Sequence, residues 1–505
     1  MPPILSSFLK HLFNDVSIEV IIFNATSHRF SPTTGVLQGS ILSPFLYSLY
    51  INSLPGILRN EESLQHINTQ LSTAPRSTVT PLLNIDNTQT APLPSINCLL
   101  YADDVVLIGT PEKIKDLLLQ CEEHSYQLGY RWNPAKSVIV EHPQSLSTTY
   151  QLYNSTIPKA TSFTYLGIPV NYKGQLDGKQ LIARNATSAE KAMRILSSIG
   201  ISPTGVSKIL SVRLYTQFIR PKLEYDLAIT TPNKQQQQTL EIAQNNCIRQ
   251  IYGAHSHSST QVMRHLHKLP SMKERTTILQ AKFLLSTYYL PDDALLTQLI
   301  PYLNQHTKSK WHLLNKSTLW QQLPEPKNNT TTATFKATKR SYLMNELSQK
   351  INAPIGAINL AACRPKLVID PILWLPMSRK ERSRCIRWRL GWLPGGKIKA
   401  CQTCGFENFH KNHAISCLNI HKRLEIPDHI TSDPISYLLN QLPQSKPTSH
   451  KKINFWKNIW PTICTILAEI DAHQHPTSNQ HQYFDEHPGK AFTTWIDNPS
   501  PHQNE

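Results

Sequence analysis

The sequence lacks the features that mark a membrane or secreted protein. No apolar run approaches the roughly 20 residues that a membrane-spanning helix needs. The N-terminus, Met1-Pro2-Pro3-Ile4, has neither the basic flank nor the apolar core of a signal peptide. The 9 cysteines are few for 505 residues and odd in number, which argues against a disulfide framework. We therefore expect an intracellular protein with reduced cysteines, and the nucleus is a compatible location.

Acidic residues are also scarce. The chain has 34 Asp and Glu against 51 Lys and Arg, a formal net charge of +17, and a pI near 9.4. Such an excess attracts polyanions, of which nucleic acid is the commonest. A basic surface without a specific partner remains an alternative, whereas no compact basic amphipathic helix favours a membrane surface. The acidic residues after position 290 form no convincing nuclease set, so no endonuclease or RNase H segment is assigned.

Composition and apolar spacing predict an α+β chain of several parts without internal repeats. At 57.4 kDa and 40% hydrophobic residues, the chain can form two to four domains. Residues 60–95 are rich in Ser, Thr, Asn, Gln and Pro, which predicts a polar insertion. Beyond a helical region at about 173–321, we expect a polar linker at 322–340, a basic helical region at 341–472 and a disordered tail at 473–505.

Local patterns predict several individual elements. We expect helices at 4–13, from about 43, and at 111–128. We expect strands at 18–23, 96–100, 105–108, 137–140, 150–153 and 163–169.

Two adjacent carboxylates provide the strongest chemical signal. The segment 99–108 reads LLYADDVVLI, which places Asp103 and Asp104 at a bend between two apolar strands. Neighbouring anions held rigidly repel each other unless a cation intervenes, and magnesium takes carboxylate and phosphate oxygens. Such a pair can support two-metal phosphoryl transfer. An exposed Asp-Asp turn without function is the alternative for the hairpin taken alone.

Three further segments accompany the hairpin. Residues 31–47 read SPTTGVLQGSILSPFLY, and Gly39 in them offers a backbone that a nucleotide can approach closely. Residues 128–137 read LGYRWNPAKS, and residues 163–168 read FTYLGI. Together with the Tyr-x-Asp-Asp hairpin and in this order, they resemble the palm of reverse transcriptases from non-LTR (LINE-type) retrotransposons.

The resemblance implies roles for individual residues. Asp103 and Asp104 would ligate catalytic Mg²⁺, and Lys136 would protonate the departing pyrophosphate. Gln38, Gly39 and Tyr101 would line the pocket for template and incoming deoxynucleoside triphosphate. Tyr165, Leu166 and Gly167 would hold the DNA primer opposite an RNA template, although Tyr165 and Leu166 can also serve as core residues.

The resemblance also implies a domain layout. Residues 1–172 would form a partial palm that carries the insertion, and residues 173–321 would form a helical thumb and connection.

One part of the family pattern is missing. In that family an aspartate that bridges both metals lies some tens of residues before the Gln-Gly motif, and only 37 residues precede Gln38. Asp15 is the only nearby aspartate and falls in the connecting helix, and the fingers are absent too. We therefore expect an N-terminally truncated polymerase, or a gene model that begins at an internal methionine, which is inactive alone because the metals lose a shared ligand.

A basic segment follows at 378–392, SRKERSRCIRWRLGW. If it is helical, Arg384, Arg387 and Trp388 share a face, and with Arg389 they could contact phosphates and stack on bases. The alternative is a solvated basic helix whose tryptophans are buried in a small core.

The next segment predicts a structural zinc site. Cys401, Cys404, His413 and Cys417 have the spacing C-x₂-C-x₈-H-x₃-C, which supplies three thiolates and one imidazole for Zn²⁺. His410 is an alternative fourth ligand, and chance is the alternative to the motif as a whole. The cluster also resembles the cysteine–histidine knuckle downstream of the polymerase in many non-LTR elements.

Three functions remain in competition at this point. An RNA-directed DNA polymerase explains the Asp pair, Gln38-Gly39 and Lys136. A non-catalytic RNA- or DNA-binding remnant fits the missing front end. A zinc-binding regulator unrelated to polymerases explains the cysteine cluster alone and ranks last.

Overall fold

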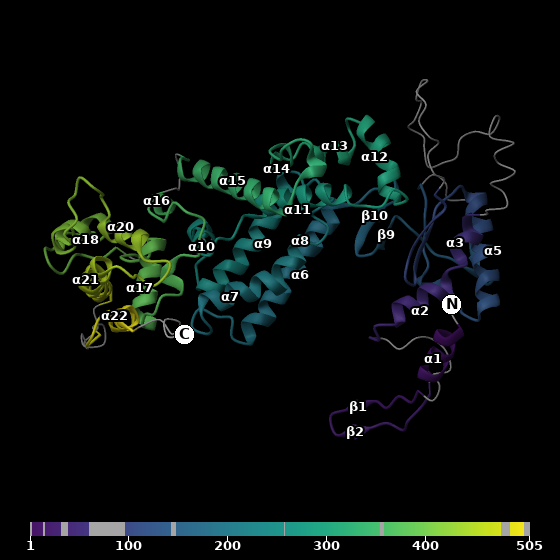
Figure 1. Cartoon of the computed structure of the whole chain (residues 1–505), viewed down its shortest axis with the longest axis horizontal. Helices are drawn as coiled ribbons and strands as arrows, with labels where there is room; N and C mark the ends of the chain where they lie inside the picture. The colour runs from purple at the N-terminus through teal and green to yellow at the C-terminus, as the bar shows by residue number, and fades with distance from the viewer. Residues whose placement is uncertain are drawn as a thin grey trace. The chain divides into compact units, whose positions relative to one another are not determined.

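The computed structural model describes residues 3–13, 16–31, 39–59, 96–142, 148–256, 258–353, 358–396, 398–475 and 485–498 (Figure 1). The chain divides into two compact units, unit 1 from Met1 to Leu176 and unit 2 from Asp177 to Glu505. The predicted insertion at 60–95, together with Gln38 and Asp15, lies outside the described residues. No helix in the described part of the chain is long and apolar enough to cross a membrane.

Unit 1 combines helices with short two-stranded ladders, as the predicted α+β class requires. Its helices are α1 (Pro3–Phe13), α2 (Ser43–Ile51), α3 (Leu54–Arg59), α5 (Pro111–Leu128) and the 3₁₀ helix Pro134–Lys136. Its antiparallel ladders pair β1 (Ile21–Ile22) with β2 (Ala25–Thr26), β3 (Cys98–Tyr101) with β4 (Asp104–Leu107), β6 (Gln151–Leu152) with β7 (Ser155–Thr156), and β9 (Ser162–Tyr165) with β10 (Ile168–Asn171). A parallel ladder joins β5 (Ile139–Val140) to β8 (Lys159–Ala160).

The core of unit 1 fixes the β3–β4 hairpin against helices. Leu54 and Leu58 of α3 and Leu117 of α5 are fully buried, and Leu100 and Leu107 of the hairpin pack against them. Helix α5 begins with the Thr110 side chain accepting from the Lys113 N–H, and it ends at Gly129, whose φ of 75° suits a left-handed cap. The base of the hairpin is therefore anchored while its tip is free to face solvent.

The described secondary structure of unit 2 consists of helices joined by loops. Its first half contains α6 (Gly178–Ser198), α7 (Lys208–Leu214), the π-helix Tyr215–Ile219, α8 (Arg220–Glu224), α9 (Lys234–Tyr252), α10 (Thr260–Leu266), α11 (Met272–Thr287), α12 (Leu295–Gln305), α13 (Lys310–Asn315), α14 (Thr318–Gln321) and the 3₁₀ helix Lys327–Asn329. Its second half contains α15 (Thr332–Ile351), α16 (Ile358–Ala361), the 3₁₀ helix Pro371–Leu373, α17 (Arg379–Leu390), α18 (Lys411–Cys417), α19 (Ile420–Arg423), α20 (Pro434–Gln441), α21 (His450–Gln474) and α22 (Lys490–Asp497).

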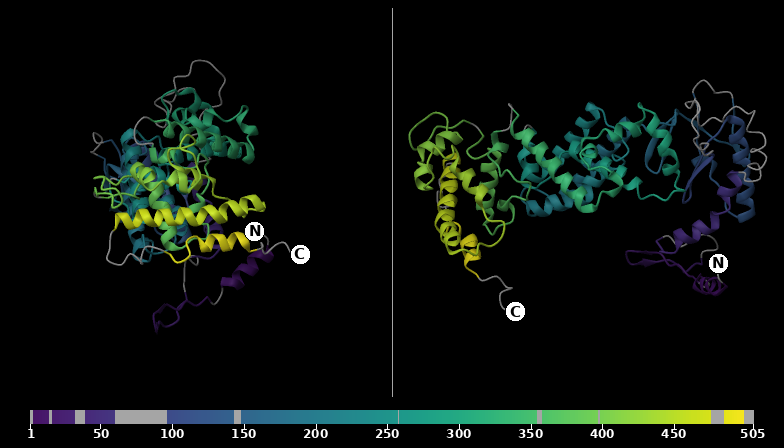
Figure 2. Two further views of the ribbon diagram at one scale, coloured as in Figure 1. Left: turned by 90° about the vertical axis from the view of Figure 1, so that its left-hand side faces the viewer. Right: turned by 45° about the horizontal axis from the view of Figure 1, so that its top comes forward.

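One large apolar cluster runs through most of unit 2. It joins residues of α6 and α9 with α17 and α21, including the fully buried Trp388 and Trp460. Both views of Figure 2 show α22 beside α21, and Phe492 of α22 is fully buried 5.1 Å from the Trp460 ring. A smaller cluster packs α15 against α11, α13 and α14.

Three sequence predictions need correction. Residues 332–340 of the predicted linker belong to α15, because Phe335 and Tyr342 pack into the smaller cluster. Part of the predicted disordered tail forms α22, because Phe492 and Ile496 are buried. The single strand predicted at 163–169 is a hairpin, since the chain turns at Leu166 and Gly167.

Candidate metal centres and nucleic-acid surface

The Asp pair occupies the tip of the β3–β4 hairpin. Tyr101 pairs with Asp104 in the ladder, which leaves Ala102 and Asp103 as a two-residue turn. Ala102 has φ 51° whereas Asp103 has no positive φ, and a positive φ at the first central position alone is the mark of a type II′ turn. A residue with a Cβ is strained there by about 1–3 kcal/mol, a cost typical of functional sites.

Both carboxylates are exposed. Asp103 and Asp104 are exposed, as is the Tyr101 side chain at 63%, and no described cation forms an ion pair with either acid. Burial and then the charge of Asp103 raise the pKa of Tyr47 on α2. Burial and then the charge of Asp104 raise the pKa of Tyr165 at the end of β9. Each tyrosine thus lies close enough to one of the two carboxylates for its pKa to respond to that charge.

The β9–β10 hairpin presents the segment predicted to hold the primer. Tyr165 pairs with Ile168, and Leu166 and Gly167 form the turn with φ values of 49° and 78°. Two consecutive positive φ angles define a type I′ turn, which suits the twist of a tight hairpin. Since the charge of Asp104 reaches Tyr165, this hairpin tip and the acidic tip lie near each other.

For the two remaining described polymerase residues, Gly39 and Lys136, the structure gives backbone geometry and exposure but no hydrogen bond or ion pair with the acidic tip. Gly39 has φ 90°, and a Cβ added to it would meet no atom within 4 Å, so its backbone is open to approach. Lys136 ends the 3₁₀ helix Pro134–Lys136 and is exposed. No hydrogen bond or ion pair among the described residues joins Lys136 to Asp103 or Asp104.

A third carboxylate does not join the pair within the described residues. The one group of three or more close metal-ligating side chains in that part of the chain is the set Cys401, Cys404, His413 and Cys417. Asp103 and Asp104 therefore offer two acidic ligands without a described third.

The Cys₃His group has the geometry of a closed zinc site. Its four ligand atoms all lie within 4.8 Å of one another. The Sγ atoms of Cys401 and Cys417 are 3.7 Å apart, and Cys404 Sγ is 3.4 Å from His413 Nε2. Tetrahedral zinc, with Zn–S of about 2.3 Å and Zn–N of about 2.0 Å, requires separations of about 3.8 and 3.5 Å. The donor set and its spacing fit the metal.

Local structure prepares this group. Gly405, at φ 77°, lets its N–H donate to the Cys401 carbonyl and closes the first knuckle. His413 and Cys417 project from α18 one turn apart, and the Phe406 ring stacks on His413 at 4.6 Å. His410 is the N-cap of α18, and its Nδ1 accepts from the His413 N–H at 3.2 Å. The close group of donor atoms therefore contains His413, whereas His410 caps the helix.

Comparison with known families bears on unit 1. Residues 2–170, about a third of the chain, match the family described as reverse transcriptase (RNA-dependent DNA polymerase). The match supports a reverse transcriptase. It ends within β10 and so covers both hairpins whose tips lie together. No curated protein matches the chain.

Helix α17 lies outside the residues that match reverse transcriptases. Its burial contradicts the nucleic-acid contacts predicted for Arg384, Trp388 and Arg389, whereas Arg387 keeps 25% of its side chain exposed. Arg384 and Arg389 are 2% exposed and Trp388 is fully buried. Arg384 Nε donates to Asp471 at 3.0 Å, and both terminal nitrogens of Arg387 donate to the same carboxylate at 2.8 and 2.7 Å.

Arg389 and Trp388 are also engaged within the protein. Arg389 donates to the Ala362 carbonyl at 2.9 Å, and the Trp388 indole donates to Ser436 Oγ at 3.1 Å. Arg389 and Trp388 therefore stabilise the core of unit 2, and sequence reasoning missed Asp471 as the shared partner of Arg384 and Arg387. Nothing near Asp471 in the sequence signals that pairing.

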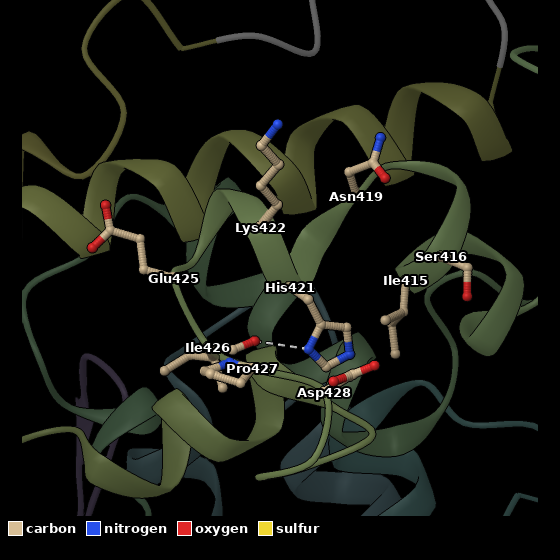
Figure 3. A pocket seen from close by; sticks show the side chains of 9 residues that line it. All are labelled: Ile415, Ser416, Asn419, His421, Lys422, Glu425, Ile426, Pro427 and Asp428. Carbon is tan, nitrogen blue, oxygen red and sulfur yellow. Dashed lines mark hydrogen bonds between the residues drawn. The ribbon is translucent and has the colours of Figure 1, made fainter.

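A cavity of about 580 Å³ is lined by Ile415 and Ser416, which directly precede Cys417 in the sequence (Figure 3). It is lined from α18, α19 and the following loop, and His421 Nδ1 donates to the Ile426 carbonyl at 2.9 Å. Figure 3 shows Lys422, Glu425 and Asp428 around it, so its charges are mixed. None of the residues predicted to act in the reverse transcriptase lines it.

Proposed function

We propose that unit 1 is the catalytic part of an RNA-directed DNA polymerase of the non-LTR retrotransposon type. The observation that carries this proposal is the exposed pair Asp103 and Asp104 on a strained two-residue turn, with Tyr165 of the second hairpin beside it. The match of residues 2–170 to reverse transcriptases supports the same conclusion. In this proposal residues 1–172 form the palm and residues 173–321 the thumb and connection.

The proposed roles follow from what each group can donate or accept. Asp103 and Asp104 provide oxygen ligands, and Mg²⁺ held there would supply charge neutralisation for two-metal nucleotidyl transfer. Gly39, with Gln38 before it, and Tyr101 line the template and nucleotide pocket. Lys136 carries the proton for the leaving pyrophosphate, and the Tyr165–Gly167 turn positions the primer terminus.

We also propose that this chain on its own does not synthesise DNA. Two carboxylates without a described third leave two divalent cations short of a shared anionic ligand. That observation also favours the second candidate, a remnant that binds RNA or DNA without chemistry.

We further propose that Cys401, Cys404, His413 and Cys417 hold structural zinc. Four protein ligands leave no open position for a catalytic water. The metal would tie α18 to the turn at Gly405 and so support the packing of Phe409 and Ala414 in the core of unit 2.

Magnesium binding tests the acidic tip separately from catalysis. We expect D103N/D104N to weaken Mg²⁺ binding to the full chain at least about tenfold in calorimetry, since both exposed ligands are neutralised. A matched control is D292N/D293N, because Asp292 and Asp293 are also adjacent and exposed but lie outside any hairpin. Equal loss in the two variants would contradict the proposed site.

Primer extension tests the second half of the proposal. On a primed RNA template, the full chain is expected to give no Mg²⁺-dependent synthesis. Synthesis that disappears in Asp103→Ala would refute inactivity and establish the polymerase.

A further inference from the structure

Helices α11 and α15 of unit 2 pack side by side (Figure 1). Ile278 and Ala281 of α11 share an apolar cluster with Phe335 and Tyr342 of α15. Lys282 directly follows Ala281, and Lys336 directly follows Phe335. Lys339 lies one turn beyond Phe335 on the same face of α15, half-buried beside the seam. The contact therefore brings lysines from both helices to its edge.

Lys268 extends this group from the loop between α10 and α11. It lines a small cavity of about 50 Å³ together with Leu343 and Leu347, which places it beside α15. Its φ is 55°, in a position after a helix end where glycine is favoured. A lysine at this φ costs about 1 kcal/mol or more relative to glycine. Lys268 therefore does not stabilise the backbone at this position. We call Lys268, Lys282, Lys336 and Lys339 the basic seam.

Acidic side chains do not balance this charge. The two helices carry seven Lys and Arg residues and two Glu residues. Glu274 is buried, holds the Ser271 N–H at 2.7 Å and pairs with Lys350. Arg275 is occupied by Glu224, with two contacts of 2.6 Å. The seam lysines form no ion pair among the described residues.

The electrostatics of Lys339 agree with this arrangement. Burial and then the charges of Arg275, Lys268, Lys336 and Lys282 lower the pKa of Lys339. Like charges at this density raise the local concentration of a polyanion.

We propose that the basic seam binds the sugar–phosphate backbone of a nucleic acid. The choice of nucleic acid among polyanions rests on the proposed function. Lysine offers point charges to phosphates without reading bases, so the contact would be independent of sequence and sensitive to salt. Each phosphate contact on a duplex contributes about 0.9 to the slope of log affinity against log salt.

The test compares K336Q/K339Q with wild type in the full chain. Binding to a 20-base-pair RNA–DNA hybrid is followed by fluorescence anisotropy across salt concentrations. Two lost contacts should reduce the salt slope by about 1.8 and weaken binding about tenfold or more at 0.1 M salt. Glutamine preserves helix propensity, so circular dichroism should remain unchanged.

The control is K451Q/K452Q, which removes the same charge from two exposed lysines at the start of α21. Equal losses in both variants would show a general charge effect and overturn the seam. Polyglutamate is the competitor that tests for an acidic protein partner. If it displaces the hybrid as well as nucleic acid does at equal charge, the basic seam would be assigned to an acidic protein instead. The hybrid-binding assay is read without Mg²⁺ and without synthesis, so failure of the catalytic proposal leaves its result intact.

Discussion

Asp471 balances the charge of two arginines of α17 inside unit 2. Burial alone would raise its pKa, but hydrogen bonds and charges from Arg387 and Arg384 hold the pKa below its ordinary value. Arg384 is buried as well, with only 3% of its side chain exposed. Removing the carboxylate would take the closest counter-charge from the buried Arg384 and leave it Asp485 at 3.8 Å, which is costly in the core.

We predict that Asp471→Asn destabilises the protein by about 3 kcal/mol at pH 7. Urea unfolding measures the change. Glu469→Gln on the same helix is the control, because Glu469 also forms a two-point pair, with Arg423, but both partners are about 30% exposed. A pair exposed to that degree contributes about 0–1 kcal/mol.

The same substitution has a defined pH dependence. Because the folded pKa of Asp471 is depressed, its stabilisation is complete above the unfolded pKa of about 4 and declines as pH falls through the folded value. The difference between wild type and Asp471→Asn should therefore shrink below about pH 4. A difference that grows on acidification would contradict the ion pair.

For Arg384, the sequence predicted the helix but not the burial of the side chain. The helical face of Arg384, Arg387 and Trp388 was evident from spacing, and the structure has the helix. The direction of that face depends on a carboxylate more than 80 residues away. Charge patterning identifies a basic face but cannot tell whether a distant acid will bury it.

At the scale of elements, the sequence predicted those helices and turns whose ends are set by neighbouring residues. Helix α5 begins at Pro111 and ends at Leu128 as predicted, because the Thr110 cap, the first-turn proline and Gly129 all act within one turn. The turn at Asp103 was predicted from the apolar strands that flank it. The first nine residues of α15 and the whole of α22 were missed, because Thr-rich and polar surroundings mask the few aromatic residues, Phe335 and Phe492, that pack these segments.

The zinc knuckle allows a sharp test at this scale. We predict that Cys404→Ser lowers bound zinc and the thermal midpoint together, because hydroxyl is a poor zinc ligand and α18 loses its tie to the turn at Gly405. Atomic absorption and thermal unfolding measure the two quantities on the same preparation.

His410→Asn is the matched control for this element. Asparagine preserves the cap on α18 that His410 provides, so zinc content and midpoint should both remain at wild-type values. Zinc loss in His410→Asn with retention in Cys404→Ser would reassign the fourth ligand and refute the set.

At the scale of the whole molecule, the net positive charge and the reverse transcriptase match fall in different units. Residues 1–176 contain 10 Lys and Arg against 12 Asp and Glu, whereas residues 177–505 contain 41 against 22. Unit 1 thus carries a net charge of −2 and unit 2 of +19. The part that matches reverse transcriptases therefore lacks the net positive charge that would attract a nucleic acid over distance.

Core packing follows the same division. The clusters of unit 1 involve residues between 47 and 157, and those of unit 2 involve residues between 182 and 496. No described apolar cluster spans the boundary at Asp177. Since each unit buries its own apolar side chains, we expect each to fold without the other.

We predict that a fragment of residues 177–505 retains cooperative unfolding, zinc content and hybrid affinity within a few-fold of the full chain. Affinity should stay because all of the net positive charge, including the basic seam, is in this fragment. A fragment of residues 1–176 should bind the same hybrid at least about a hundredfold more weakly at 0.1 M salt, because its net charge repels phosphates. Comparable affinity of the two fragments would place the main nucleic-acid contacts on the hairpins of unit 1, and a salt slope near zero for residues 177–505 would contradict phosphate binding by its lysines.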